Sequence, residues 1–375
     1  MRRYLCAPDS FKGSLSAPAA GAAMASGIRA SFPDAVIDEC PVADGGEGTV
    51  EALVRATAGE FRTTRVTDPL GRPIDATWGL LGKQEVPTAV IEMAAASGLT
   101  LLEAGERDPT RTSSFGTGQL MLAAAEAGAQ RVLLGLGGSA TTDGGGGAAM
   151  ALGVRFFDAA GAPLDSFTGA DLERVQRIET SGRRFANLQI VICRDVDNLL
   201  TGPDGAAAVY GPQKGATPTQ VTQLDHGLDH IAGIWAEQLG IEVRSEVGAG
   251  AAGGMGGGIT AMLGAETRSG IETVLDVVGF RQRVRGAILC LTGEGQLDSQ
   301  SLSGKACVGV AKAAQAEGVE TVAIVGSLRL DDDSALREFG MRAIELAPGV
   351  STEESMQGAA ELLSERAAKA VRNLD

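Results

Sequence analysis

The sequence predicts an α/β fold built from largely parallel sheets. Short, almost entirely apolar segments alternate along the chain with Ala-rich segments of helical periodicity, which is typical of this class. The apolar segments show little polar alternation, as expected for parallel strands that are covered on both faces. The chain has 375 residues, which is enough for about two domains. Because 44% of the residues are apolar, there is ample material for a core.

The apolar segments predict the strands in chain order. They lie at Arg3–Ala7, Val36–Val42, Ala89–Met93, Arg131–Leu136, Val154–Phe157, Leu188–Cys193, Ala287–Leu291, Thr321–Val325 and Ala343–Leu346. Residues 61–82 predict two further strands, because Asp68-Pro-Leu-Gly71 between them is a turn sequence. Helices are expected at Ala17–Ser31, Thr49–Ala58, Gly118–Ala127, Gln220–Leu239, Cys307–Gln315 and Glu353–Val371.

Charge and cysteine content narrow the class of protein. The formal net charge is −15 and no basic stripe is present, so we do not expect nucleic-acid binding. No apolar run approaches the ~18 residues of a membrane span. Asp9 and Lys12 interrupt what would be the apolar region of a secretory signal, so we do not expect one. The five cysteines include no C-x-x-C pair, which argues against disulfides and structural zinc. We therefore expect a cytoplasmic protein with small-molecule partners, and homo-oligomer formation stays open.

Glycine is the unusual component, with 53 residues, about twice the usual ~7%. The glycines cluster where predicted strands end, at 45–48, 135–147, 248–258 and 293–295. Ligands in open α/β sheets bind beyond the carboxyl ends of strands, and glycine lets backbone N–H groups approach an anion closely. Several of these loops also carry a carboxylate. The combination favours phosphoryl transfer from a nucleotide.

Two loops near the N-terminus carry candidate substrate-binding residues. Lys12 follows the first predicted strand and can reach a phosphate or carboxylate, while Asp9 and Ser10 can bind a hydroxyl. The alternative for this loop is a helix start capped by a serine. Asp44 and Glu47 flank glycines after the second strand, and they can hold Mg²⁺ or a substrate hydroxyl. The alternative there is a turn in which Asp44 caps the next helix.

The segment Gly135–Ala140 matches the dinucleotide pattern G-x-G-x-x-G/A, and Asp158 ends the next predicted strand where a ribose-binding acid is expected. However, the crossover helix of that motif should run unbroken, and four consecutive glycines at 144–147 oppose a helix. A loop for nucleotide phosphates, with Ser139, Thr141 and Thr142 as donors, is therefore favoured over a nicotinamide site.

Further candidates lie in the second half of the chain. Asp195 ends the strand at Leu188–Cys193, a favoured place for a base or a Mg²⁺ ligand. Lys214 stands between glycines, and 248–258 is interpreted as a backbone nest or hinge, with a flexible linker as the alternative. Glu294 and Asp298 are candidates for Mg²⁺ or a substrate hydroxyl. His226 and His230 at i, i+4 can form a metal pair, but an exposed helical face is favoured because no third ligand is evident.

Motifs that occur in order over nearly the whole chain resemble those of the glycerate kinase family in its bacterial type I form. They are Pro8–Lys12, Val42–Thr49, Ile91–Gly98, Gly137–Gly144, Gly211–Gly215, Gly248–Gly257, and Thr292–Gly295 with Asp298–Ser301. Each motif alone is weak, but the ordered set is highly specific. One departure concerns Asp195–Gly202, where Leu199 stands in place of the family's proline and Asp197 adds a charge.

The resemblance implies an ATP-dependent kinase that phosphorylates glycerate with Mg²⁺ and gives 2-phosphoglycerate. It also implies two α/β domains with the active site in the cleft between them. On this basis we expect a discontinuous domain at 1–88 and 287–375 and an inserted domain at 89–286 that carries the Gly-rich phosphate loops. A NAD-dependent dehydrogenase of a small hydroxy acid and a non-catalytic glycerate sensor remain as alternatives.

Within that framework each candidate residue receives an expected role. Glycerate is bound by Asp9, Ser10, Lys12 and Glu47. Asp195 orients or deprotonates the attacking hydroxyl, with Asp44 as the rival base. The residues expected to bind the ATP phosphates are Gly137, Gly138, Ser139, Thr141, Asp143, Gly253 and Gly254. Mg²⁺ is held by Asp195 or Glu294, and Lys214 neutralises charge on the transferred phosphoryl group.

Overall fold

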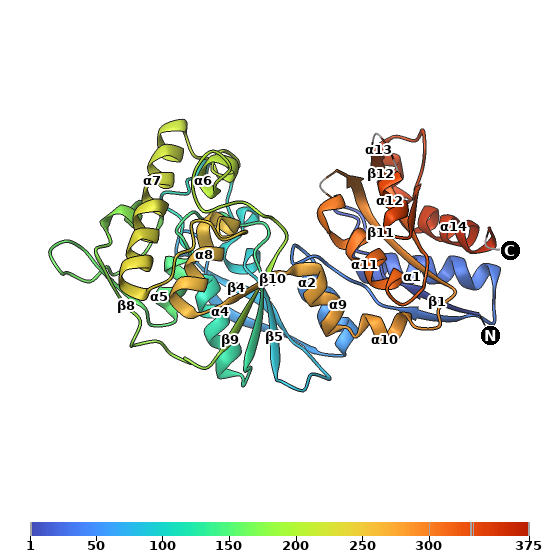
Figure 1. Cartoon of the computed structure of the whole chain (residues 1–375), viewed down its shortest axis with the longest axis horizontal. Coiled ribbons are helices and arrows are strands. Elements are labelled where there is room, and N and C mark those ends of the chain that lie inside the picture. The colour runs from blue at the N-terminus through green and yellow to red at the C-terminus, as the bar shows by residue number, and fades with distance from the viewer. Residues whose placement is uncertain (1, 300, 331, 333, 374–375) are drawn as a thin grey trace. The chain divides into compact units, whose positions relative to one another are not determined.

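A computed structural model describes residues 2–299, 301–330, 332 and 334–373. The chain forms two compact units. Unit 1 comprises residues 1–44, 51–58 and 270–375, and unit 2 comprises 45–50 and 59–269. Figure 1 shows the consequence for unit 1, where blue elements from the N-terminus and orange to red elements from the C-terminus lie together. Each unit has its own sheet and its own core.

Unit 1 is built on a five-stranded sheet in the order β13-β12-β11-β1-β2, and all of its pairings are parallel. The strands are β1 (Arg3–Cys6), β2 (Val36–Glu39), β11 (Leu289–Asp298), β12 (Thr321–Arg329) and β13 (Met341–Glu345). In such a sheet every carboxyl end points to the same edge. The loops that follow β1, β2 and β11 therefore meet there.

Helices cover both faces of the unit 1 sheet. Those with most of their residues in this unit are α1 (Ala17–Ser31), α2 (Thr49–Thr57), α9 (Gly270–Val277), α10 (Phe280–Val284), α11 (Ala306–Gln315), α12 (Ser334–Glu338), α13 (Thr352–Gln357) and α14 (Ala359–Arg372). Helices α1 and α14 share one apolar core with the sheet, whereas α11 and α12 share another. The start of α1 is fixed locally, because the Ser16 hydroxyl accepts a hydrogen bond from the Ala19 N–H.

Unit 2 is built on a six-stranded sheet in the order β10-β9-β6-β5-β4-β3. The strands are β3 (Glu60–Thr67), β4 (Pro73–Leu80), β5 (Thr88–Glu92), β6 (Arg131–Gly135), β9 (Gln189–Arg194) and β10 (Glu266–Ser269). Strands β5, β6, β9 and β10 are parallel, and β3 and β4 add an antiparallel hairpin. A separate two-stranded sheet pairs β7 (Arg155–Phe157) with β8 (Arg177–Glu179).

The helices of unit 2 bury one large apolar cluster against this sheet. They are α3 (Ala94–Ser97), α4 (Phe115–Glu126), α5 (Gly146–Ala151), α6 (Ala206–Tyr210), α7 (Pro218–Ile234) and α8 (Ala251–Leu263). A π-helical segment, Trp235–Leu239, continues α7. The start of α7 follows from sequence, because Thr217 and Gln220 form a capping box and Pro218 occupies the first turn.

The mixed α/β fold with mostly parallel sheets is confirmed, and two predicted elements need correction. The segment Thr292–Gly295 was expected in a loop, but it lies inside β11, where Glu294 is paired with Val325 of an equally extended β12. The helix expected at Glu353–Val371 is broken at Gly358 into α13 and α14. The apolar start of β11 was visible in the sequence, whereas its extension by pairing with β12 was not. The polar strands β8 and β10 were not predicted.

The units divide the chain at other residues than those expected for the domains. Residues 59–88 belong to unit 2, because β3 and β4 complete its sheet beside β5. Residues 270–286 belong to unit 1, where α9 packs against α11 and the Arg283 side chain bonds Asp38 at 2.5 Å. The pairing of a hairpin with a sheet edge and an ion pair between distant residues do not alter the local composition. Composition could therefore not reveal these boundaries.

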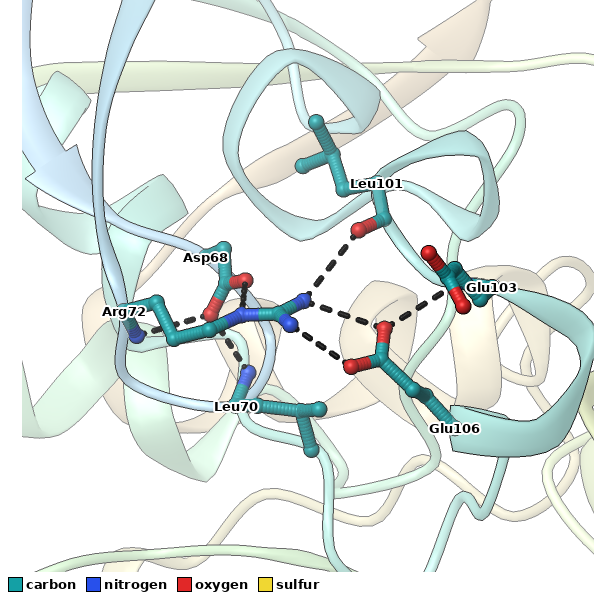
Figure 2. A network of polar contacts seen from close by, with 6 residues as sticks. All are labelled: Asp68, Leu70, Arg72, Leu101, Glu103 and Glu106. Atoms are coloured by element: carbon teal, nitrogen blue, oxygen red, sulfur yellow. Dashed lines mark hydrogen bonds and ion pairs between the residues drawn. The ribbon is translucent and has the colours of Figure 1, made fainter.

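The turn of the β3–β4 hairpin is fixed by a polar network around Arg72 (Figure 2). Asp68 is buried and accepts hydrogen bonds from the Leu70 N–H and from the N–H and Nε of Arg72. The terminal nitrogens of Arg72 reach both oxygens of Glu106, at 2.6 and 3.2 Å, and the Leu101 carbonyl. This pairing lowers the pKa of Glu106. The predicted turn is confirmed, and the network attaches it to the segment around residues 99–106.

Candidate active site

In unit 1, three carboxylates gather at the carboxyl ends of neighbouring strands. Asp9 follows β1, Asp44 follows β2, and Glu294 lies in the second half of β11. The Asp9 loop is tied to β11, because the Asp9 N–H donates to the Gly293 carbonyl at 2.8 Å. Asp9, Asp44 and Glu294 interact electrostatically. The structure therefore brings together three of the predicted site residues.

The protonation of this cluster is shifted. Burial raises the pKa of Glu294 to about 7, and the neighbouring Asp44 adds to the rise. Burial also raises the pKa of Asp9, with Asp44 as the next cause. The Oε1 atom of Glu294 is buried and has no hydrogen-bond partner within the described part of the chain. Such an oxygen is suited to a cation or a ligand hydroxyl.

Lys12 and Ser10 lie in the loop between β1 and α1. Lys12 is exposed, and it makes no ion pair with any residue that the structure describes. The Ser10 N–H donates to Asp9 Oδ1 at 2.5 Å. The serine-capped start of α1 is present as well, at Ser16. Capping and ligand binding are thus compatible in this loop, because they use different residues.

In unit 2, the carboxyl ends of four parallel strands are aligned in register. Glu92 of β5 is paired with Gly135 of β6, Gly135 with Cys193 of β9, and Cys193 with Arg268 of β10. Asp195 follows immediately after Arg194, the last residue of β9. The glycine loop at 137–147 follows β6 at the same edge. The predicted phosphate loop and the predicted base therefore leave adjacent strands.

The segment Gly45–Val50 packs against this edge. A Cβ atom on Gly45 would lie 2.7 Å from the Cys193 carbonyl oxygen, so only glycine allows this approach. The Val50 N–H donates to Glu92 Oε1 at 2.8 Å. Glu92 thus satisfies the N-terminus of α2, a role that the alternative interpretation of the Asp44 loop gave to Asp44. Glu47 is exposed in the same segment.

Sequence reasoning assigned no role to Glu92, although it lies in one of the recognised motifs. The available signal was a single acid at the end of an otherwise apolar strand. Burial raises the pKa of Glu92, and hydrogen bonds from backbone N–H groups of the Gly48–Val50 segment oppose the rise. The partner of this acid comes from residues more than forty positions away, so its role could not be derived locally.

Asp143 organises the glycine loop at 137–147 from within. The residue is fully buried, and its carboxylate accepts hydrogen bonds from the N–H and hydroxyl of Ser114 and from the N–H groups of Gly145 and Gly147. Burial raises its pKa, and the hydrogen bonds oppose the rise. Gly137 and Gly138 are the more open part of the loop, and Ser139 is largely buried.

Lys214 lies under the same loop. Its side chain is only 1% exposed, and Nζ donates to the Thr141 carbonyl at 2.6 Å. Burial lowers the pKa of Lys214 to about 7, and the negative charge of Asp143 opposes the shift. The hydroxyls of Thr141 and Thr142 are buried without a hydrogen-bond partner among the described residues. The structure thus brings together Lys214, Thr141 and Asp143, three of the candidate site residues.

The second glycine-rich segment, at 248–258, packs directly against the loop at 137–147. Ala252, Gly253 and Gly254 form a run of left-handed residues inside α8. The Gly144 N–H donates to the Gly253 carbonyl at 3.0 Å, and a Cβ atom on Gly253 would lie 2.1 Å from the Thr141 carbonyl oxygen. The flexible-linker alternative is therefore wrong for this segment, which is buried and packed.

Asp195 is surrounded by a second set of polar contacts. It lies near Tyr210, and after burial it is the next cause of the raised pKa of the Tyr210 hydroxyl. That hydroxyl donates to Asn198 Oδ1 at 2.6 Å. The Asn198 carbonyl accepts from the Gly250 N–H at 3.0 Å, which connects this loop to the second glycine segment. Asp197 pairs with Arg194, so the added charge noted in the sequence has a partner.

The geometry does not support the dinucleotide site at Gly135–Ala140 or a metal site at His226 and His230. Helix α5 begins only at Gly146, outside the dinucleotide pattern, and Asp158 accepts the Ala160 and Ala162 N–H groups in an exposed turn. His230 contacts the Val175 carbonyl at 2.7 Å. Within the described ranges, no group of three or more His, Cys, Asp or Glu residues is placed to hold a metal ion. None of the described helices is long and apolar enough to cross a membrane.

Comparisons with known proteins place this site in a family. A sequence model described as the glycerate kinase family matches residues 4–375. The chain is 45% identical to a glycerate kinase of Bacillus subtilis (strain 168) over 97% of its length and 96% of the relative. It is also 45% identical to a glycerate 2-kinase of Escherichia coli (strain K12), over 91% and 89% of the two chains.

A solved structure agrees with these relatives. The crystal structure assigned to glycerate kinase 2 from Salmonella typhimurium LT2 superposes with a TM-score of 0.87 at 40% identity. The similarity covers 100% of this chain and 98% of that one. Together with strand-end loops rich in glycine and carboxylates, these matches define the class as an α/β kinase. The chain belongs to the glycerate kinase family.

Proposed function

We propose that this chain is an ATP-dependent kinase that phosphorylates D-glycerate on its 2-hydroxyl to give 2-phosphoglycerate. The observation that carries the proposal is the pair of packed glycine segments with Lys214 buried beneath Thr141, at the sheet edge that also bears Asp195. The choice of the 2-hydroxyl draws on the similarity to the Escherichia coli glycerate 2-kinase. The substrates are small molecules, and the proposed compartment is the cytoplasm. No observation favours the dehydrogenase or the sensor.

In unit 1, we assign the binding of glycerate to the loop after β1. Lys12 is an exposed cation without an ion pair among the described residues, and so it is available for the substrate carboxylate. Ser10 supplies a hydroxyl, and Asp9 can accept a hydrogen bond from a substrate hydroxyl when it is ionised. Asp44 and Glu47 remain candidates for the same task. This assignment also explains how a chain of net charge −15 attracts an acid locally.

In unit 2, we assign the ATP phosphates to the loops around Gly137, Gly138 and Ser139 and around Gly253 and Gly254. Backbone N–H groups in such loops bind phosphate oxygens without a charged side chain. Thr141, Asp143 and Lys214 are buried, and so we propose that they fix the conformation of the loop and supply charge from its buried side. A cation in a buried place acts over a longer range than one in water.

The transfer itself needs a base and a charge-compensating environment. Asp195 accepts the proton of the attacking hydroxyl while a new bond forms between that oxygen and the γ-phosphorus. The bond between the γ-phosphorus and the bridging oxygen then breaks, and ADP leaves with the electron pair. Catalysis of this step consists mainly of positioning and electrostatic stabilisation. Losing one such contact costs about 3–4 kcal/mol of transition-state stabilisation.

The residues present fit a Mg²⁺ ion. Carboxylate oxygens are the ligands it prefers, and Glu294 Oε1 is buried without a donor among the described residues. Protein sites for Mg²⁺ usually supply only one or two carboxylates, with substrate phosphates and water completing the shell. Either Glu294 of unit 1 or Asp195 of unit 2 is the proposed protein ligand, and when bound the ion would neutralise phosphate charge.

The direct test is incubation with ATP, Mg²⁺ and D-glycerate, followed by phosphorus NMR. We expect ADP and a phosphomonoester signal whose coupling assigns the phosphate to carbon 2. A signal on carbon 3 would overturn the regiochemistry alone. Absence of ADP with glycerate and related hydroxy acids, in a preparation that is folded, would overturn the kinase proposal.

A further inference from the structure

The segment 107–112 packs against the loop that we assign to the ATP phosphates. A Cβ atom on Gly215, the residue after Lys214, would lie 2.1 Å from the Arg107 carbonyl oxygen. The Thr112 hydroxyl donates to the Ala140 carbonyl at 2.9 Å. Arg107 thus lies beside the residue that follows Lys214, and Thr112 lies beside the loop, although no motif in the sequence includes either of them.

Arg107 carries a positive charge that no described residue neutralises. It makes no ion pair with any residue in the described ranges, and its Nε atom is buried without a hydrogen-bond partner there. The side chain as a whole is half-buried. A buried donor of a charged group that stays unpaired is costly, so a partner is expected in the functional state.

The acids beside Arg107 in sequence are committed elsewhere. Glu106 holds Arg72 with both of its oxygens (Figure 2). Asp108 Oδ1 accepts hydrogen bonds from the N–H and hydroxyl of Thr110 and from Gln220 Nε2. Many arginines of unit 2 have a carboxylate partner, for example Arg174, Arg184 and Arg244. In an acidic chain, an arginine left without a partner between two acids is therefore unusual.

The loop at 139–142, against which this segment packs through Thr112, also holds buried donors. The Thr141 and Thr142 hydroxyls are fully buried and have no partner among the described residues. The Lys214 ammonium has three N–H groups, of which one reaches the Thr141 carbonyl. The nearby carboxylate of Asp143 is already engaged by four protein donors. Donors thus outnumber acceptors in this region, as in a site for an oxyanion.

We propose that Arg107 is a further phosphate-binding residue, which together with the loop at 139–142 holds a phosphate of the nucleotide. A guanidinium offers several donors in a fixed plane and matches the geometry of phosphate oxygens. The inference rests on the proposed nucleotide site in unit 2. It extends that site to a residue that the glycine motifs do not reveal.

The test compares ligands with and without phosphates. We expect Arg107→Gln to weaken ATP binding about 10- to 100-fold by titration calorimetry, while adenosine binding and the KM for glycerate change less than twofold. Arg107→Lys should recover part of the loss. The control is Arg111→Gln, which removes the same charge from an exposed position on the same segment. ATP affinity within twofold of the parent in folded Arg107→Gln, or an equal loss in both variants, would overturn the proposal.

A second measurement uses the unmodified chain and so does not depend on variant folding. Phenylglyoxal modifies accessible arginines, and mass spectrometry locates the adducts. We expect ATP to protect Arg107 and to leave Arg111 unprotected, whereas glycerate alone protects neither. Protection by glycerate and not by ATP would overturn the proposal. A chain that binds ATP but does not phosphorylate glycerate would instead overturn the proposed function and leave the assignment of Arg107 standing.

Discussion

The ammonium of Lys214 donates a hydrogen bond of 2.6 Å to the main-chain carbonyl of Thr141, and both side chains are shielded from solvent. This contact fixes the centre of the loop that follows β6. It also places a titrating cation behind the loop, because burial lowers the pKa of Lys214 to about 7. The consequences for stability and activity can be measured separately.

Replacing Lys214 by Met should change how stability depends on pH. In the parent, the unfolded lysine binds a proton up to about pH 10.5, whereas the folded one releases it above about pH 7. The unfolding free energy should therefore rise with pH between those values, by at most ~1.4 kcal/mol per unit. Urea unfolding from pH 7 to 10 should show a flatter slope for Lys214→Met. The exposed Lys369→Met is the control, and a slope equal to the parent's in Lys214→Met would contradict the prediction.

Glu294→Gln should also change how the unfolding free energy depends on pH, but at lower pH and in the opposite direction to Lys214→Met. The pKa of Glu294 is raised from 4.5 to about 7, so the folded state retains a proton that the unfolded state loses. In the parent, this residue's contribution makes stability fall as pH rises from about 4.5 to 7. In the variant this fall in stability should be absent, and so the variant should be more stable than the parent at pH 8. Unfolding titrations with Glu365→Gln as the exposed control test this, and a variant less stable at pH 8 would refute it.

Asp195→Asn tests the proposed base. Because an amide cannot accept the hydroxyl proton, we expect kcat to fall by roughly 100-fold or more while the melting temperature stays near that of the parent. Asp197→Asn is the matched control, since Asp197 lies in the same loop and pairs with Arg194 instead. A coupled assay for ADP measures both. Near-normal turnover in Asp195→Asn, together with near-normal turnover in Lys12→Ala, would exclude the assigned roles.

Asp143→Asn should destabilise the chain. The amide retains one acceptor oxygen, but its NH₂ group would face backbone donors that now bond the carboxylate. We expect a loss of roughly 2–4 kcal/mol in the free energy of unfolding, since buried donors are left without an acceptor. Asp158→Asn serves as the control, because Asp158 accepts two N–H groups in an exposed turn. Equal losses in the two variants would mean that burial of Asp143 is not the cause.

Gly253→Ala tests the close approach of the two glycine segments. The residue has φ +68°, and the added Cβ would lie 2.1 Å from the Thr141 carbonyl oxygen. Gly264→Ala is the control, because Gly264 has φ +74° with nothing within 4 Å of the added atom. The control should lose about 1–2 kcal/mol from backbone strain alone. We expect a clearly larger loss and a raised KM for ATP in Gly253→Ala, and similar values in both would argue against close packing.

Much of the fold was accessible from local patterns. The apolar runs at Arg131–Leu136 and Leu188–Cys193 are strands within about one residue of their predicted bounds, because a strand buried on both faces must be apolar throughout. The cap at Thr217 and the turn after Asp68 were also set by neighbouring residues. Asp195 and the glycines at 137–147 could be selected as candidates because strand ends carry the ligand sites of α/β sheets.

The sequence by itself determined the class of fold, the succession of strand-end loops and the family, since these depend on periodicity and on ordered motifs. Only the tertiary structure decided that Glu92 completes the α2 N-terminus and that Asp143 is enclosed by four donors. It also decided that the Arg107 backbone packs against Gly215, next to Lys214, while the Arg107 side chain has no ion pair among the described residues. The physical reason is that burial and charge compensation depend on partners brought together by sheet pairing. Arg107 and Lys214 are separated by more than one hundred residues, and nothing local to either predicts the other.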